Sequence, residues 1–82
     1  MLTRFKHPSE EVLPEALSKD FDGLLVEIRA FNGHPSYRVT VPGVNAHTEA
    51  QAFDYALDHV YEKYSADGYE YHHCEIIDVL TK

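Results

Sequence analysis

Residues 48–64 read TEAQAFDYALDHVYEKY, and this stretch decides the fold. Thr48 is a favourable N-cap residue, and Gln51 three positions later completes a capping box. The apolar residues that follow recur at helical spacing and form one stripe: Ala52, Phe53, Ala56, Leu57, Val60, Tyr61 and Tyr64. Gly68 suits a left-handed exit from a helix. The stretch therefore predicts an amphipathic helix over about residues 49–64.

Two predicted strands precede this helix. Residues 24–31 and 36–41 alternate between apolar and polar side chains, which is the period of a half-buried strand. Asn32-Gly33 lies between them and is a strong hairpin signal. On the outer side of such a hairpin, Glu27 and Arg29 could pair with Arg38 and Thr40, which would stabilise modestly.

The two ends of the chain are harder to interpret. Residues 69–80 predict a long final strand whose alternation is imperfect, and a bulge near residues 73–75 would reconcile its two halves. Residues 2–6 predict a short strand. Pro14 suits the first position of a short helix ending near Lys19. The buried stripe of that helix would consist of Leu13, Ala16, Leu17 and Phe21.

Together these elements predict a single compact α+β domain over residues 1–82. The order is βαββαβ, or αββαβ if the first strand is absent. The longer order is the ferredoxin-like pattern, a small antiparallel sheet with two helices packed on one face. A chain of this size buries a thin core, so each large apolar residue matters.

The negative charge is unevenly distributed along the chain. Of the net charge of −7, residues 44–82 carry −6 (two lysines against eight acids), and residues 1–43 carry −1 (five cations against six acids). A concentrated negative field favours a positively charged partner and repels nucleic acid. The sequence has no apolar run near the ~20 residues that span a bilayer and no visible secretory signal. Cys74 is the only cysteine, so we expect a reducing, cytoplasmic setting.

Three acids on the predicted helix form a regular row. Asp54, Asp58 and Glu62 are spaced at i, i+4 and i+8, so their carboxylates repeat every ~6 Å. The row contains no cation, so neighbouring charges repel mildly. It either presents fixed anions to a basic groove, in imitation of a nucleic-acid backbone, or is simply a solvated face.

Tyrosines lie among the acids of the second half of the chain. Tyr55, Tyr69 and Tyr71 are close in sequence to the acidic residues, and tyrosine offers a large contact area at low entropic cost. They either anchor a partner or pack over the rim of the sheet.

Metal and catalytic motifs are weak in this sequence. His72 and Cys74 would share one face of the last strand, but the other histidines lack zinc-site spacing. Cys74 with His59 lacks the remaining groups of a nucleophilic site. No glycine-rich phosphate loop is present. We therefore predict neither an enzyme nor a cofactor, and no direct binding of nucleic acid.

These observations favour a small acidic binding protein that docks on a basic surface of a nucleic-acid-handling protein. By size and charge alone it is comparable to nucleic-acid mimics such as viral inhibitors of CRISPR effectors, which would place it in the host cytoplasm. The predicted contact residues are Asp54, Tyr55, Asp58, Glu62, Asp67, Tyr69, Glu70 and Tyr71. The alternative is a ligand- or metal-sensing ferredoxin-like module that uses the 72–74 strand and dimerises through its sheet.

Overall fold

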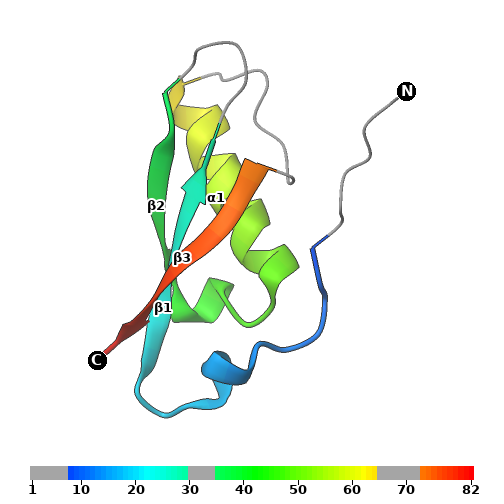
Figure 1. The fold of residues 1–82 in the computed structure, drawn as a ribbon, viewed down its shortest axis with the longest axis vertical. Helices are drawn as coiled ribbons and strands as arrows, with labels where there is room; N and C mark the ends of the chain where they lie inside the picture. The colour runs from blue at the N-terminus through cyan, green and yellow to red at the C-terminus, as the bar shows by residue number, and fades with distance from the viewer. Residues whose placement is uncertain (1–7, 30–34, 65–72) are drawn as a thin grey trace.

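A three-stranded antiparallel sheet and one long helix make up the fold (Figure 1). The computed structural model describes residues 8–29, 35–64 and 73–82. The elements in chain order are η1 (Pro14–Leu17), β1 (Phe21–Ile28), β2 (Tyr37–Pro42), η2 (Gly43–Asn45), α1 (Glu49–Tyr64) and β3 (Cys74–Thr81). The strand order is β2-β1-β3, so β1 is central. No helix in these ranges has the length and apolar character needed to cross a bilayer.

The predicted α+β class is confirmed, but the predicted pair of helices is wrong. Within the described residues the order is ββαβ, with one α-helix on the sheet. The segment beginning at Pro14 forms only a four-residue 3-10 turn, because no side chain caps its start and Ser18 already returns to an extended conformation. Leu17 is 78% exposed instead of buried. The strand predicted over residues 2–6 lies outside the described residues.

The first two strands pair as the alternating pattern predicted. β1 and β2 are antiparallel, with Leu24 opposite Val41 and Glu27 opposite Arg38. Leu24, Val26 and Ile28 on β1 are buried and face α1, whereas Glu27 lies on the opposite face. β1 extends further toward the N-terminus than expected, to Phe21, and ends earlier, at Ile28. Most of the predicted turn lies outside the described residues.

The last strand contains a bulge, but not where the sequence suggested. β3 runs antiparallel to β1, with Leu25 opposite Asp78 and Val26 opposite Ile76, so Ile77 is the extra residue. This insertion lets Ile76 and Val79 both pack against the core while Asp78 stays exposed. The predicted bulge over residues 73–75 is therefore wrong in position. The predicted start of the strand, over residues 69–72, lies outside the described part.

The core fills the space between α1 and one face of the sheet. Its buried members are Leu24, Val26, Ile28, Val39, Val41, Ala46, Ala52, Phe53, Ala56, Leu57 and Val60. The predicted helix stripe is confirmed from Ala52 to Val60. It is wrong at Tyr61, which is 43% exposed. The side chain of Tyr64 lies outside the described part of the chain.

The start of α1 is held by a variant of the predicted capping box. The Gln51 backbone N–H donates to Thr48 Oγ1 at 3.0 Å, as predicted. Gln51 Oε1, however, accepts the backbone N–H of His47 at 2.9 Å, one residue before the N-cap. Residues from the N-terminal segment add to this arrangement, since Ala50 N–H donates to the Ser9 carbonyl at 3.0 Å and Leu13 N–H to the His47 carbonyl at 2.8 Å.

Thr48→Ala should lower the free energy of unfolding by about 1 kcal/mol, because the first turn of α1 loses the side-chain acceptor of its N-cap. Urea unfolding followed by circular dichroism would measure the loss. Thr48→Ser keeps the hydroxyl and is the matched control, expected to retain most of the stability. Equal losses in the two variants would mean that the methyl group of Thr48, and not its hydroxyl, supports the helix.

Candidate functional site

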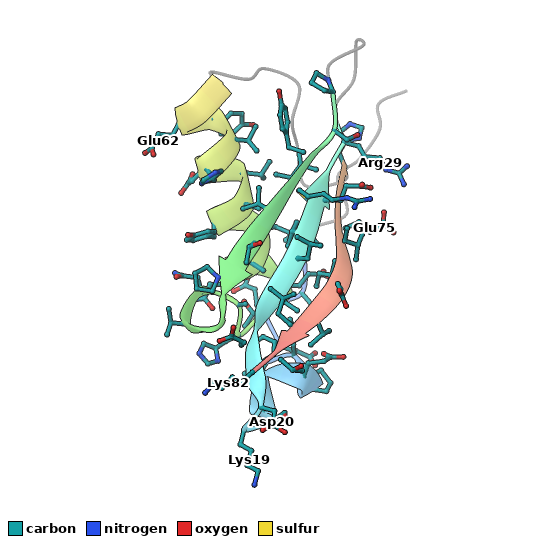
Figure 2. The ribbon with its side chains drawn as sticks, turned by 90° about the vertical axis from the view of Figure 1, so that its left-hand side faces the viewer. Lys19, Asp20, Arg29, Glu62, Glu75 and Lys82 are labelled. Carbon is teal, nitrogen blue, oxygen red and sulfur yellow. The ribbon has the colours of Figure 1, made fainter. Side chains whose placement is uncertain are left out.

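The candidate interface is the solvent-facing side of α1. Asp54, Asp58 and Glu62 are all exposed, while Phe53, Leu57 and Val60 on the other side of the helix are buried against the sheet. Figure 2 shows Glu62 pointing away from the sheet. We call Asp54, Asp58 and Glu62 the carboxylate row. The helix thus presents these three acids on one face, as their spacing predicted.

None of the acids in the carboxylate row is neutralised by a described side chain. The ion pairs among the described residues involve Arg38, which lies on β2, and Arg29, which directly follows β1. Burial, followed by repulsion from Asp58, raises the pKa of the Asp54 carboxyl above its ordinary value. The charged form of Asp54 therefore carries an electrostatic cost, which a cationic partner would relieve.

Two tyrosines border the carboxylate row. At about 100° of rotation per residue, Tyr61 lies about 20° from Asp54 on one side and Tyr55 about 20° from Glu62 on the other. Tyr61 is 43% exposed, whereas Tyr55 is partly buried and packs against the core. Tyr61 was missed by the sequence analysis, which assigned it to the core. Tyr61 lies four residues after the buried Leu57 and three residues after the exposed Asp58. It is therefore at the boundary between the buried and the exposed face of the helix.

Four of the predicted contact residues lie outside the described residues: Asp67, Tyr69, Glu70 and Tyr71. Their proximity to the carboxylate row stays a prediction.

The remaining acids of the second half do not extend the carboxylate row. Glu75 and Asp78 lie on β3 opposite Glu27 and Leu25, and both are exposed. By strand alternation this is the face of the sheet turned away from α1. Negative charge in the described part of the second half is therefore divided between two faces of the molecule.

A network of ion pairs covers part of that outer face. Glu27 accepts from Arg38 Nε and from Arg29 Nε, each at 3.3 Å, which confirms the predicted pairing of Glu27 with Arg38. Arg29 also reaches Glu75 at 3.5 Å, and both residues lie at one end of the sheet in Figure 2. Because Glu27 and Glu75 are directly opposed, Arg29 offsets their repulsion. The hydrogen bonds from Arg38, and then Arg29, lower the pKa of the Glu27 carboxyl.

Glu27→Gln should reduce the dependence of stability on acid pH. A carboxyl with a lowered folded pKa contributes fully above its ordinary value of 4.5, and the contribution is lost as pH falls through the lowered pKa. The Tm difference between the wild-type protein and the variant should be constant near neutrality and shrink below about pH 4.5. Glu15→Gln, at an exposed acid without an ion pair among the described residues, is the control. A Tm difference unchanged at about pH 3 would contradict this role.

The predicted metal and nucleophile candidates gain no support from the described residues. His72 lies outside them, and no cluster of three His, Cys, Asp or Glu side chains capable of holding a metal occurs within them. Cys74 packs against the core, whereas His59 is exposed on α1, so the two side chains lie in different layers. Burial raises the pKa of the Cys74 thiol to about 12. This thiol is therefore protonated at neutral pH.

Cys74 should react slowly with iodoacetamide in the folded protein. A pKa of about 12 in place of 9.0 lowers the thiolate fraction about a thousandfold near pH 8. Mass spectrometry should show little alkylation under native conditions and rapid alkylation in concentrated urea. Comparable rates in both conditions would show an accessible, ionisable thiol and would revive the metal and nucleophile interpretations.

No protein-family model matches this chain, and neither a curated protein nor a solved structure shows significant similarity to it.

Proposed function

We propose that the protein is a small non-enzymatic inhibitor that docks the exposed face of α1 on a basic surface of a nucleic-acid-handling protein. The observation that carries the proposal is the carboxylate row, three exposed acids without a cationic partner among the described residues. Regularly spaced anions on a rigid helix resemble the charge pattern of a nucleic-acid backbone. A surface that binds nucleic acid would therefore accept the row, and binding would compete with DNA or RNA.

The tyrosines beside the row favour arginine over lysine on the partner. A guanidinium can donate two parallel hydrogen bonds to a carboxylate and can stack on an aromatic ring, whereas an ammonium is a point charge. Tyr61 supplies exposed aromatic surface next to Asp58. Tyr55 supplies a partly buried ring that packing holds in place. In the proposed complex the acids would steer the encounter, and the tyrosines would supply the desolvated contacts.

The distribution of cations supports the same orientation. Figure 2 shows Lys19 and Lys82 at the end of the molecule opposite to Glu62. Arg29 and Arg38 are engaged by Glu27 and Glu75 on the outer face of the sheet. Asp20 and Asp22 offset the two lysines at that end, so an approaching basic surface would be attracted chiefly to α1. We include Asp67, Tyr69, Glu70 and Tyr71 in the proposed contact set because they follow α1 in the chain.

The alternative, a sensing module that dimerises through its sheet, is favoured by one observation. β3 is an edge strand of the described sheet, so its outer hydrogen-bonding groups could pair with a second copy. Size-exclusion chromatography with light scattering tests this directly, because the alternative requires a dimer and the α1 proposal does not.

Replacing the carboxylate row by neutral isosteres (Asp54→Asn, Asp58→Asn, Glu62→Gln) should leave the fold intact. Removing the like-charge neighbours should preserve or raise the free energy of unfolding, by a few tenths of a kcal/mol per pair. Affinity for an arginine-rich peptide, measured by fluorescence anisotropy, should fall at least about tenfold. A lysine-rich peptide of equal length should bind the wild-type protein more weakly. The wild-type affinity should also decrease with added salt.

The matched control is Glu10→Gln, Glu11→Gln and Glu15→Gln, which changes the net charge by the same amount at exposed N-terminal positions. Its peptide affinity should fall much less. Partners captured from lysate by the wild-type protein and released by DNA should be missing from the carboxylate-row variant alone. Binding that survives in that variant, or falls equally in the control, would mean that the row is only a solvated face.

A further inference from the structure

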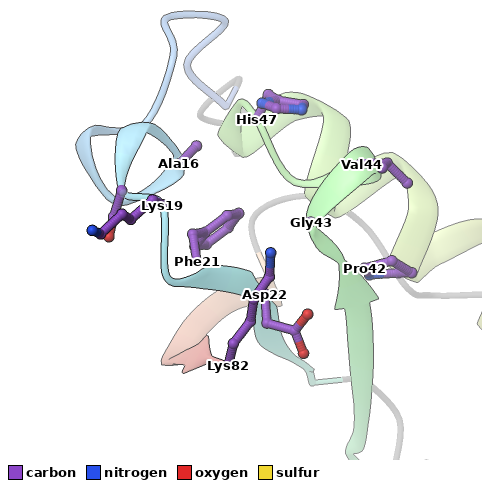
Figure 3. A pocket seen from close by; sticks show the side chains of 10 residues that line it. Ala16, Lys19, Phe21, Asp22, Pro42, Gly43, Val44, His47 and Lys82 are labelled. Atoms are coloured by element: carbon purple, nitrogen blue, oxygen red, sulfur yellow. The ribbon is translucent and has the colours of Figure 1, made fainter.

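The end of the molecule that lies opposite to Glu62 in Figure 2 contains a pocket that the proposed interface does not use (Figure 3). Its volume is about 430 Å³, which is within the ~300–1,000 Å³ range of small-molecule sites. Three segments far apart in the sequence line it: residues 16–22, residues 42–47 and Lys82. Convergence of distant segments makes the pocket a product of the tertiary fold and not of one loop.

Backbone contacts hold the walls of this pocket. Lys82 N–H donates to the Asp20 carbonyl at 2.8 Å, and Phe21 N–H donates to the Ser18 carbonyl at 3.2 Å. Gly43 allows η2 to approach the start of β1, because a Cβ there would lie 3.3 Å from the Asp22 carbonyl oxygen. Gly23 next to this junction has a φ of 154°, and a Cβ there would collide with the Val41 carbonyl oxygen. The close approach of β1 and β2 thus depends on glycine.

Apolar side chains form much of the pocket surface. Phe21 is partly buried and packs against the core, so its ring is held in place. Ala16 lies on the same side of the pocket as Phe21, and Pro42 and Val44 lie on the opposite side (Figure 3). Val44 is 75% exposed, so it contributes little to the core and leaves apolar surface facing solvent at the pocket. A flat apolar group could lie against Phe21 and remove this surface from water.

The pocket carries the opposite charge to the protein as a whole. Lys19 and Lys82 against Asp22 give its lining a formal charge of +1 (2 − 1), whereas the chain carries −7. Figure 3 shows the Lys82 side chain directed toward Phe21, whereas that of Lys19 points away from the pocket. Neither lysine forms an ion pair with a described carboxylate. The Lys82 ammonium is therefore available to an anion that enters beside Phe21.

We propose that this pocket binds a small carboxylate with a flat apolar body. The carboxylate would accept hydrogen bonds from the Lys82 ammonium, and the apolar body would lie on Phe21, on the side that faces Pro42 and Val44. A monoanion fits better than a phosphate dianion, because the ammonium of Lys82 is the lysine group directed toward Phe21, whereas Lys19 points away. Asp22 at the same pocket disfavours a second negative group.

Titration of the ¹⁵N-labelled protein with phenylacetate tests the proposal, with phenylacetamide and phenethylamine as neutral and cationic probes of similar shape. Phenylacetate should cause saturable shifts of the backbone amide signals of Phe21, Gly43 and His47, with weaker binding of the amide and weakest binding of the amine. Lys82→Gln should weaken phenylacetate binding about tenfold, the effect of one charge-assisted hydrogen bond. Lys19→Gln makes the same charge change at a side chain that points away, and should weaken it no more than about twofold.

Three results would overturn the proposal. The first is the absence of saturable shifts at millimolar phenylacetate. The second is equal or tighter binding of phenethylamine, which would make Asp22 the dominant charge. The third is an equal loss of affinity in the Lys82 and Lys19 variants, which would mean nonspecific attraction. The Phe21→Leu variant keeps an apolar side chain and should fold. It should bind phenylacetate more weakly, because the flat contact surface is lost.

Discussion

The packing of one helix face against β1 and β2 is the contact on which the whole structure depends. Eleven buried apolar residues constitute the core, and they come from α1, β1, β2 and the short segment after η2. A domain of this size has no second core to compensate for a loss. Ala52 and Ala56 keep α1 close to the sheet, while Phe53, Leu57 and Val60 fill the space between the larger side chains of the strands. The stripe must therefore be both apolar and correctly phased.

This one-sided packing also divides the polar surface into separate regions. The outer side of α1 keeps its acids without described partners, whereas the outer face of the sheet pairs Glu27 with two arginines. Asp54 and Glu27 illustrate the contrast, since the surroundings raise the pKa of the first carboxyl and lower that of the second. Charge on the sheet is used within the molecule. Charge on the helix remains available for another molecule, which is the physical basis of the proposed docking.

The two proposed binding surfaces differ in how they arise. The carboxylate row is a property of one helix, and it would exist on any fold that buries the other side of α1. The pocket beside Phe21 depends on the junction of β1 with η2 and on the anchoring of Lys82 to Asp20. Their opposite charges would let the protein engage a basic partner and a small anion at different ends. Neither surface uses Cys74, whose thiol is protonated at neutral pH.

Local sequence determined α1 and the pairing of β1 with β2. The N-cap at Thr48, the helical spacing of the apolar residues and the alternation in β1 and β2 are short-range signals, and each acts within a few residues. They were sufficient to predict the bounds of α1, the exposure of Asp54, Asp58 and Glu62, and the pair formed by Glu27 and Arg38. Tertiary structure decided the rest. Ile77 is bulged because Ile76 and Val79 must both reach the core, and that requirement exists only once β3 pairs with β1. Tyr61 is exposed because no second helix packs beside α1 in the described structure, and Leu17 is exposed because the turn at Pro14 ends after one turn. Burial of a residue at the edge of a stripe depends on what packs next to it, and no local pattern contains that information.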